Sequence, residues 1–360
     1  MNSLLLYQWN EMIDKGLPEM GRWQKQLLGE FSYGVLSAQS CNLNKVAQEL
    51  TGRANASSRE RRLQRWLANE RVDMEALFGA WMDWVLRLWG KAPLVILVDE
   101  TKLSDHVAVM MVGVAYHASA IPLIWRAYSV EDYPEEGQVA LMSALLAQLR
   151  SHLPSDQAAL LLADRGLGTS PVWQERLSDS GWQYLLRVQR STLIRLPGQK
   201  PQPLRRLVAY GHSWSGRAQV FKKAGWQWKW VYLMWEVGYA EPWCLFSNQA
   251  DLSPDLYSQR FYHEAGFRDL KSDGFNWQRS HVWLPDHVER LLLVLALATL
   301  WSLTEGTKVR FLYPLPRRQQ RLSVFRLGLD YLFERFRSLK SKGLELFLAP
   351  DPPLLKTVVP

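Results

Sequence analysis

The chain has few cysteines, and this scarcity excludes several classes of protein. Its 360 residues include only Cys41 and Cys244, and there is no Cys-x-x-Cys pair. Two isolated cysteines argue against a disulfide framework and a structural zinc site, and they fit a reducing cytosol. The sequence also shows no internal repeat, which argues against a solenoid.

The chain also lacks a leader-like start and a long apolar run. Its first residues carry no basic region and soon reach Glu11 and Asp14, so we expect no signal peptide. The most apolar stretch, residues 291–303, includes Thr299 and Ser302 and is too short to span a bilayer. We therefore interpret it as a buried helix and expect a cytoplasmic, nucleoid-associated protein without a membrane partner.

What the sequence does contain is positive charge and tryptophan. The formal net charge is +8 and the sequence pI is about 9.4, which suits a polyanionic partner but is also found in ordinary basic proteins. Hydrophobic residues make up 48% of the chain, enough for the cores of two or three domains. Most of the 18 tryptophans are expected in those cores, although tryptophan also stacks on unpaired bases.

Residues 1–88 read as helical throughout. Apolar residues recur at helical spacing over 24–36, a short amphipathic helix follows at 45–50, and 74–88 forms another packed helix. Between them lies a helix whose exposed face carries Arg61, Arg62 and Arg65. Two short helices, the second basic, suggest a helix-turn-helix reader of DNA. The alternative is a solvated basic face on a helical bundle.

The pattern changes at residue 92 to strands alternating with helices. The order is three strands (94–98, 107–116 and 121–128), a helix (138–153), a strand (158–163), a helix (171–178) and a strand (182–188). Asp99 follows the first strand and Asp164 follows the fourth. This order resembles the ribonuclease-H-like fold, in which these two strands are neighbours and bring their carboxylates together.

Residues 189–250 interrupt this alternation. Strands are predicted at 218–222, 228–237 and 243–247, and the aromatics of 226–232 alternate so that they share one face. We interpret the segment as a β-rich insertion. After residue 285 the chain returns to helical patterns with a basic character.

A helix-sized segment after the insertion carries the most informative pattern. Tyr257, Arg260, Glu264 and Lys271 stand at offsets of 0, 3, 7 and 14, which places them on a helix stripe about 60° wide. The sequence Ser-Pro-Asp at 253–255 provides an N-cap, a proline at the first helical position and a favourable charge. One carboxylate between two cations and a phenol suits a helix that lies beside a phosphate backbone.

Phosphodiester chemistry needs oxygen ligands that hold two divalent cations a few ångströms apart. Asp99, Asp164 and Glu264 are the candidate ligands. Glu100, Asp105 and Asp269 are nearby carboxylates that the sequence alone does not exclude. Each candidate has a structural alternative, because aspartates after strands often cap helices and a glutamate four residues after an arginine can form a surface ion pair.

These residues resemble the DDE transposases of bacterial insertion sequences, in the group marked by a Y-R-E-K signature. That signature has two residues between Tyr and Arg, three between Arg and Glu, and six between Glu and Lys, and this sequence matches every gap. The likeness covers about residues 90–310. It implies an α/β fold with a ribonuclease-H-like mixed sheet flanked by helices, a β-rich insertion and an N-terminal all-α domain.

The resemblance also implies a domain plan and roles for single residues. The plan is a helical DNA-binding domain at 1–88, a catalytic domain at 89–188 and 251–310, the β-rich insertion at 189–250 and a helical, basic C-terminal region at 311–360. Asp99, Asp164 and Glu264 would be catalytic and would bind two Mg²⁺ or Mn²⁺ ions. Tyr257, Arg260 and Lys271 would contact phosphates. Relatives use a tryptophan of the insertion to hold a flipped base, and Trp235 and Trp243 are the nearest candidates, with core packing as the alternative for both.

The implied activity is cleavage of double-stranded DNA at transposon ends, followed by joining of the 3′-hydroxyls to target DNA within a homodimeric complex. Two alternatives stay open at this point. One is a catalytically silent, transposase-derived DNA-binding protein, which the presence of all three acids disfavours. The other is a different ribonuclease-H-like nuclease, which the full Y-R-E-K spacing and the insertion disfavour.

Overall fold

A computed structural model describes residues 3–132, 135, 137–338 and 343–350. The N-terminal region is helical, as predicted. Its helices are α1 (Ser3–Gly16), α2 (Arg22–Ala38), α3 (Leu43–Glu49), α4 (Ala56–Leu67) and α5 (Met74–Trp89). Asn42, Asn55 and Asp73 cap α3, α4 and α5 by accepting hydrogen bonds from backbone amides of the first turn.

The described strands form one ten-stranded mixed sheet in the order β3-β2-β1-β4-β5-β10-β9-β8-β6-β7. The strands that carry the predicted site are β1 (Leu94–Lys102), β2 (Val107–Tyr116), β3 (Ser119–Ser129), β4 (Ala159–Ala163) and β5 (Gln183–Arg187). β1 pairs antiparallel with β2 and parallel with β4, and β4 pairs parallel with β5. This 3-2-1-4-5 order confirms the predicted ribonuclease-H-like fold.

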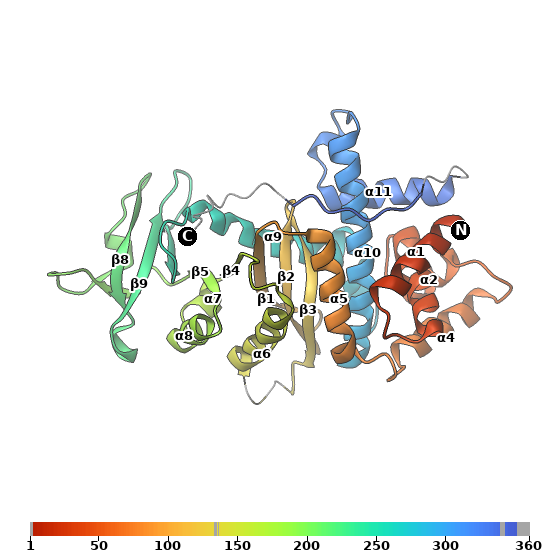
Figure 1. Cartoon of the computed structure of the whole chain (residues 1–360), viewed down its shortest axis with the longest axis horizontal. Helices are drawn as coiled ribbons and strands as arrows, with labels where there is room; N and C mark the ends of the chain where they lie inside the picture. Colours follow the sequence, from red (N-terminus) through yellow and green to blue (C-terminus); the bar gives the residue numbers. More distant parts are fainter. Residues whose placement is uncertain (1–2, 133–134, 136, 339–342, 351–360) are drawn as a thin grey trace.

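The remaining strands come from the predicted β-rich insertion. They are β6 (Leu193–Arg195), β7 (Gln202–Pro203), β8 (Ser213–Val220), β9 (Gln227–Met234) and β10 (Trp243–Ser247). β10 pairs antiparallel with β5, so these strands extend the same sheet. Figure 1 shows them at the left, far from the N-terminal helices. Short 3-10 turns lie between them at Leu204–Arg206 and Lys222–Ala224.

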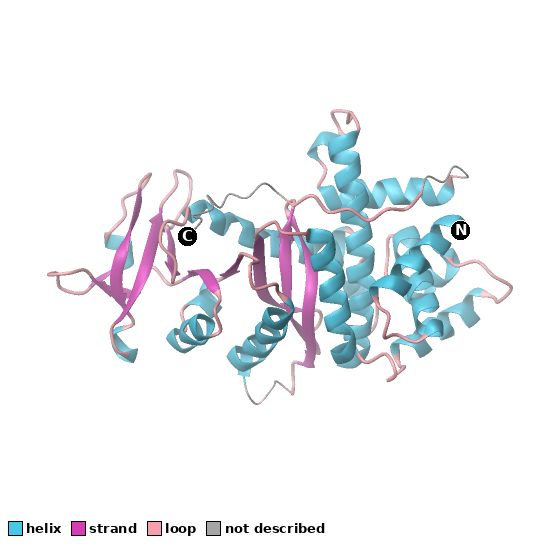
Figure 2. Ribbon diagram, in the orientation of Figure 1, coloured by secondary structure: helices cyan, strands magenta, loops and turns pink. Residues whose placement is uncertain are grey.

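Helices pack on the sheet, which borders three hydrophobic cores, one of them within the insertion. Helices α6 (Gly137–His152) and α8 (Pro171–Asp179) pack together, and Figure 2 shows them beside the central strands. Alternate residues of β1 enter different cores, since Ile96 joins the main core whereas Leu97 joins a smaller one with Tyr257. The chain from residue 254 to 273 thus covers part of the face that carries Leu97.

Helix α10 (Pro285–Leu312) connects the sheet to the N-terminal helices. The indole N–H of Trp125 on β3 donates to the Glu289 carbonyl at 3.1 Å, while the Arg290 guanidinium donates to the carbonyls of Leu67 and Val72. The helix is longer than the apolar stretch predicted and could span a membrane by length and composition alone. However, 94% of its apolar window is buried within the protein, as in the core helix of a soluble protein.

The C-terminal region contains a 3-10 turn at Gln319–Arg321 and helix α11 (Val324–Arg337), which packs on α10. Residues 339–342 and 351–360 of the predicted basic C-terminal region lie outside the described residues. The predicted domain boundaries themselves stay a prediction.

Three local predictions were wrong. The strand predicted at 218–222 is β8, which starts earlier and ends at Val220, because Phe221 has a left-handed backbone (φ 61°) and Lys222 begins a 3-10 turn. β1 continues to Lys102, so Asp99 lies inside a strand, because pairing with β2 extends past the apolar run from Val98↔Val112 to Lys102↔Ala108. The single helix predicted from residue 252 to 271 is three successive helices. They are a 3-10 helix η3 (Pro254–Arg260), an α-helix α9 (Phe261–Arg268) and a π-helix η4 (Asp269–Asp273).

Candidate active site

The register of β1 and β4 places Asp99 beside Asp164. Leu97 pairs with Leu162, and each aspartate lies two residues further along its strand direction. Both aspartates use their Oδ1 atom to hold local backbone. Asp99 Oδ1 accepts from the Glu100 amide at 2.9 Å, and Asp164 Oδ1 accepts from the amides of Gly166 and Leu167 at 2.9 and 3.2 Å.

Asp164 is therefore the N-cap of the short helix α7 (Arg165–Gly168) as well as a candidate ligand. The two roles that the sequence left as alternatives use different oxygens of one carboxylate. In both aspartates the second oxygen, Oδ2, faces Arg260. The hydrogen bonds that each Oδ1 accepts from the backbone thus fix the direction in which each carboxylate points.

Helix α9 supplies the third acid from the other side. Gly266 lets it approach β3, because a Cβ at this position would lie 3.0 Å from the Ala120 Cβ and 3.1 Å from the Ala120 backbone nitrogen. Glu264 lies two residues before Gly266 and projects toward Arg260.

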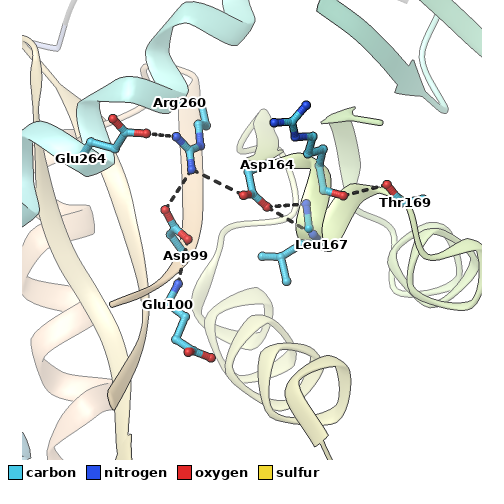
Figure 3. Close-up of polar contacts among 9 residues, drawn as sticks. Asp99, Glu100, Asp164, Leu167, Thr169, Arg260 and Glu264 are labelled. Carbon is cyan, nitrogen blue, oxygen red and sulfur yellow. Dashed lines mark hydrogen bonds and ion pairs between the residues drawn. The ribbon is translucent and has the colours of Figure 1, made fainter. Parts of the chain in front are cut away.

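Arg260 stands at the centre of the three acids. Its Nη2 atom lies 3.1 Å from Asp99 Oδ2 and 3.8 Å from Asp164 Oδ2, and its Nη1 atom donates to Glu264 Oε1. Figure 3 shows the three carboxylates directed at one guanidinium. Residues 99, 164 and 264, which are far apart in the chain, thus meet at a single cation.

The electrostatics of the site follow from this crowding. The pKa of Asp99 is raised to about 6, chiefly by burial and also by the charges of Asp164 and Glu264, while Arg260 and the hydrogen bond from the Glu100 amide oppose this rise. Burial works against the charge of Arg260, but the surrounding acids outweigh it and raise the pKa of the guanidinium. The site is therefore a partly buried cluster of three acids whose negative charge Arg260 offsets in part.

The donor set fits a divalent metal ion, because three carboxylates supply the oxygen ligands that Mg²⁺ and Mn²⁺ prefer. Within the part of the chain that the structure describes, no three acidic, histidine or cysteine side chains are grouped to hold an ion directly. In this structure Asp99, Asp164 and Glu264 are spread around Arg260, which occupies the place between them.

The alternative carboxylates have other partners. Glu100 accepts from the Tyr128 hydroxyl at 2.6 Å and from Gln138 at 3.1 Å. Asp269 accepts from the Ser119 hydroxyl at 2.7 Å, and Asp105 is exposed in the β1–β2 turn. The geometry thus favours Asp99, Asp164 and Glu264 over these three.

The predicted phosphate contacts lie close to the acids but mostly face inward. Lys271 Nζ donates to Thr101 Oγ1 at 2.5 Å and to the Lys102 carbonyl at 2.6 Å, at the end of β1. Tyr257 is 1% exposed and packs edge-on against Trp243 at 5.3 Å between ring centroids. In this structure Tyr257 is buried and the half-buried Lys271 is bound to β1, and the roles of both in binding DNA stay predictions.

The other predicted DNA contacts lie away from the acids. On α4, Arg62 forms an ion pair with Glu30, whereas Arg61 and Arg65 line a groove of about 790 Å³ together with Trp283. In the insertion, the Trp235 indole N–H donates to the Tyr239 carbonyl at 2.9 Å. Trp243 packs on Tyr257 and Phe261, as the core-packing alternative expected.

Sequence reasoning missed one charged cluster beside the site. Arg165, Arg187 and Arg190 surround the carboxylate of Glu241, which lies in the loop between β9 and β10. Arg165 directly follows Asp164, and that adjacency is the one signal in the sequence that could have pointed to this cluster.

Comparisons with solved structures and with curated proteins add little to this geometry. Among solved structures, the chain is similar to Ciona intestinalis endonuclease V in complex with a 24mer DNA containing an inosine followed by a ribo-adenosine. The identity is 12%, the likeness covers 49% of this chain and 84% of that chain, and the TM-score of 0.29 is too low to carry an argument. A comparison with curated proteins found no match.

The family comparison is more informative. Residues 128–301 match the family model described as "Transposase DDE domain". The matched segment contains Asp164, Glu264 and the insertion, whereas Asp99 precedes it. This match, together with the fold, supports a DDE transposase family for this chain.

Proposed function

We propose that this chain is a metal-dependent DNA transposase of the Y-R-E-K group from an insertion sequence. It would bind transposon ends, cleave phosphodiester bonds and join the 3′-hydroxyls to target DNA. The observation that carries this proposal is the convergence of Asp99, Asp164 and Glu264 on one cation at the centre of a ribonuclease-H-like sheet. The match to the transposase DDE domain supports the same activity.

In this proposal the residues of the chain hold the metal ions, orient the ligands and neutralise the charge of the DNA backbone. Asp99, Asp164 and Glu264 would hold two Mg²⁺ or Mn²⁺ ions, which supply activation of the attacking oxygen and charge stabilisation of the leaving oxygen. The Oδ1 anchors fix both aspartates before DNA arrives, so little reorganisation is needed when a ligand binds. Arg260 would move from the acids to a backbone phosphate, because a guanidinium binds carboxylate and phosphate oxygens alike.

The wider surface would position the DNA. We propose that Arg61, Arg62 and Arg65 contact the duplex from α4, and that Tyr257, Arg260 and Lys271 contact it near the cleaved bond. Trp235 is the candidate for stacking on a flipped base. Two copies of the chain would pair the two transposon ends in one complex.

The test is cleavage of a labelled duplex that carries the inverted repeats flanking the gene. Asp99→Asn, Asp164→Asn and Glu264→Gln should each lower the rate about a thousandfold, since each removes several kcal/mol of transition-state stabilisation. Asp105→Asn is the matched control, because this aspartate is exposed in a turn. Calorimetric titration with Mn²⁺ should show binding to the control and weakened binding to the three variants.

Three outcomes would contradict the proposal in different ways. Cleavage that persists in all three variants would rule out this site. Specific binding of the ends without cleavage under any divalent ion would favour a silent DNA-binding protein. Preference for an RNA–DNA hybrid or a four-way junction over transposon ends would favour another ribonuclease-H-like nuclease.

A further inference from the structure

Glu241 forms ion pairs with three arginines, one of which directly follows Asp164. Arg165 Nη1 and Arg187 Nη2 lie 3.0 and 2.9 Å from Glu241 Oε1, and Arg190 Nε lies 3.8 Å from Oε2. The arginines come from the start of α7, the end of β5 and the segment after β5. The glutamate comes from a different part of the chain, in the β9–β10 loop.

This arginine cluster adjoins the acids. Ala163 of β4 pairs with Leu186 of β5, so the next residues, Asp164 and Arg187, lie at the same edge of the sheet. Helix α7 packs so tightly here that a Cβ on Gly168 would lie 2.1 Å from the Arg187 carbonyl oxygen. The charge of Arg187 also reaches the site: burial raises the pKa of Tyr257, and the charges of Arg260 and Arg187 partly oppose this rise.

The cluster has more positive charge than its glutamate neutralises. Three guanidinium groups surround one carboxylate, which leaves a formal excess of two positive charges. The side chains of Arg165 and Arg190 are 53% and 49% exposed, so these charges are accessible from solvent. Guanidinium groups bind the paired oxygens of a carboxylate or of a phosphodiester with the same fork geometry.

The loop that carries Glu241 is also held by hydrogen bonds that do not involve the arginines. The Trp235 indole N–H donates to the Tyr239 carbonyl at 2.9 Å, and the Gly238 amide donates to the Tyr210 hydroxyl at 2.7 Å. These bonds do not involve the glutamate side chain. Release of Glu241 from the arginines would therefore leave the turn at residues 235–239 intact.

We propose that Arg165, Arg187 and Arg190 form a binding site for a backbone phosphate of the DNA substrate, which Glu241 occupies until DNA displaces it. This inference rests on the proposed function, since it makes the cluster part of the surface that holds the cleaved strand. None of these arginines is among the predicted DNA contacts, which lie on α4, on the segment from Tyr257 to Lys271 and at Trp235. The competing role for Glu241 is purely structural, as an ion pair that ties the loop to the sheet.

The experiment measures binding of the full chain to a fluorescein-labelled, random-sequence duplex of about 30 base pairs, by anisotropy between about 50 and 200 mM salt. Glu241→Gln should bind about 3- to 10-fold more tightly, because the duplex no longer competes with an internal anion, and its salt dependence should steepen by about one unit of slope. Glu236→Gln is the matched control, since it removes the same charge from an exposed position in the same loop.

The arginines test the site directly. Arg190→Gln and Arg187→Gln should each weaken binding and reduce the salt slope by about one. In the Arg187→Gln background, Glu241→Gln should tighten binding less than it does in the wild type, as expected for coupled residues. Arg190 is half exposed, so its variant should fold even if that of Arg187 does not.

Equal affinity of the Glu241→Gln and Glu236→Gln variants, or weaker binding by Glu241→Gln, would overturn the inference and indicate a structural ion pair. If either result is obtained while the wild type still cleaves transposon ends, the proposed function stands and only this phosphate site is rejected. Failure of the wild type and all variants to bind any duplex would overturn both proposals.

Discussion

At the residue scale, the site is built from carboxylates that each serve two purposes. One oxygen of Asp99 and one of Asp164 hold backbone amides, and the other oxygen of each faces Arg260. A substitution by asparagine keeps an acceptor for the amides and removes the charge. The asparagine variants therefore separate chemistry from folding more cleanly than alanine would.

Asp269 gives a prediction about stability and pH. Burial raises its pKa to about 7, against an ordinary value near 4, while the bond from Ser119 partly opposes this shift. Between about pH 4 and pH 7 the unfolded state loses this proton and the folded state keeps it, so the group's contribution to stability declines as the pH rises through this window. Asp269→Asn cannot ionise, so its stability relative to wild type should rise by a few kcal/mol from pH 4 to pH 8.

Urea denaturation at a series of pH values measures this difference. Ser119→Ala is a useful companion variant, because it removes the hydrogen bond and leaves the carboxyl group in place. A constant gap between the wild type and Asp269→Asn across the whole pH range would show that Asp269 is ionised in the folded protein.

The sequence indicated Asp99, Asp164 and Glu264 as candidate ligands, and that role stays a prediction, but it could not predict that Arg260 would lie between them. The helical wheel correctly grouped Arg260 with Glu264, since residues four apart share a helix face. It could not show that Arg260 would turn toward Asp99 and Asp164, because that contact depends on how η3 packs on the sheet. The spacing of residues within one helix does not show which residues of other strands will face them in the folded protein.

At the element scale, strand order was predictable and helix type was not. The apolar runs of β1 and β4 predict buried strands from their composition alone. The segment from residue 254 to 273 changes from 3-10 to α to π, and each change alters the rotation per residue from the assumed 100°. Lys271 thus lies in a π-turn and reaches β1 instead of continuing the predicted stripe.

Helix α7 gives the prediction at this scale. Gly168→Ala should destabilise the protein by about 1–3 kcal/mol, because the added methyl group would overlap the Arg187 carbonyl oxygen and push α7 from β5. Since α7 carries Arg165 and is capped by Asp164, cleavage should also fall. Gly343→Ala is the control, as a Cβ there has no neighbour within 4 Å. Equal urea midpoints for the two variants would contradict the close packing of α7.

At the scale of the whole molecule, the insertion and the catalytic strands share one sheet. β10 pairs with β5 from Ser247↔Leu185 to Leu245↔Arg187, and the Ser247 hydroxyl donates to the buried Tyr184 carbonyl at 2.5 Å. The sequence predicted the strands of residues 189–250 but not this continuity. Pairing between strands so distant in the chain leaves no mark on the composition of either one.

Hydrogen exchange tests this continuity. Amides of β10 should exchange as slowly as those of β4 and β5, because opening any of these strands disrupts the same ladder. The short β6 and β7 at the end of the sheet should exchange much faster. Exchange of β8, β9 and β10 as one group, at rates distinct from those of β4 and β5, would show that the insertion opens independently.

Helix α10 has a consequence for how the protein is made. It contacts both β3 and the N-terminal helix α2, and Figure 1 shows it between the sheet and the N-terminal helices. During synthesis the ribosome releases all of these elements long before α10. Their apolar faces must therefore stay uncovered in the nascent chain until α10 has been made.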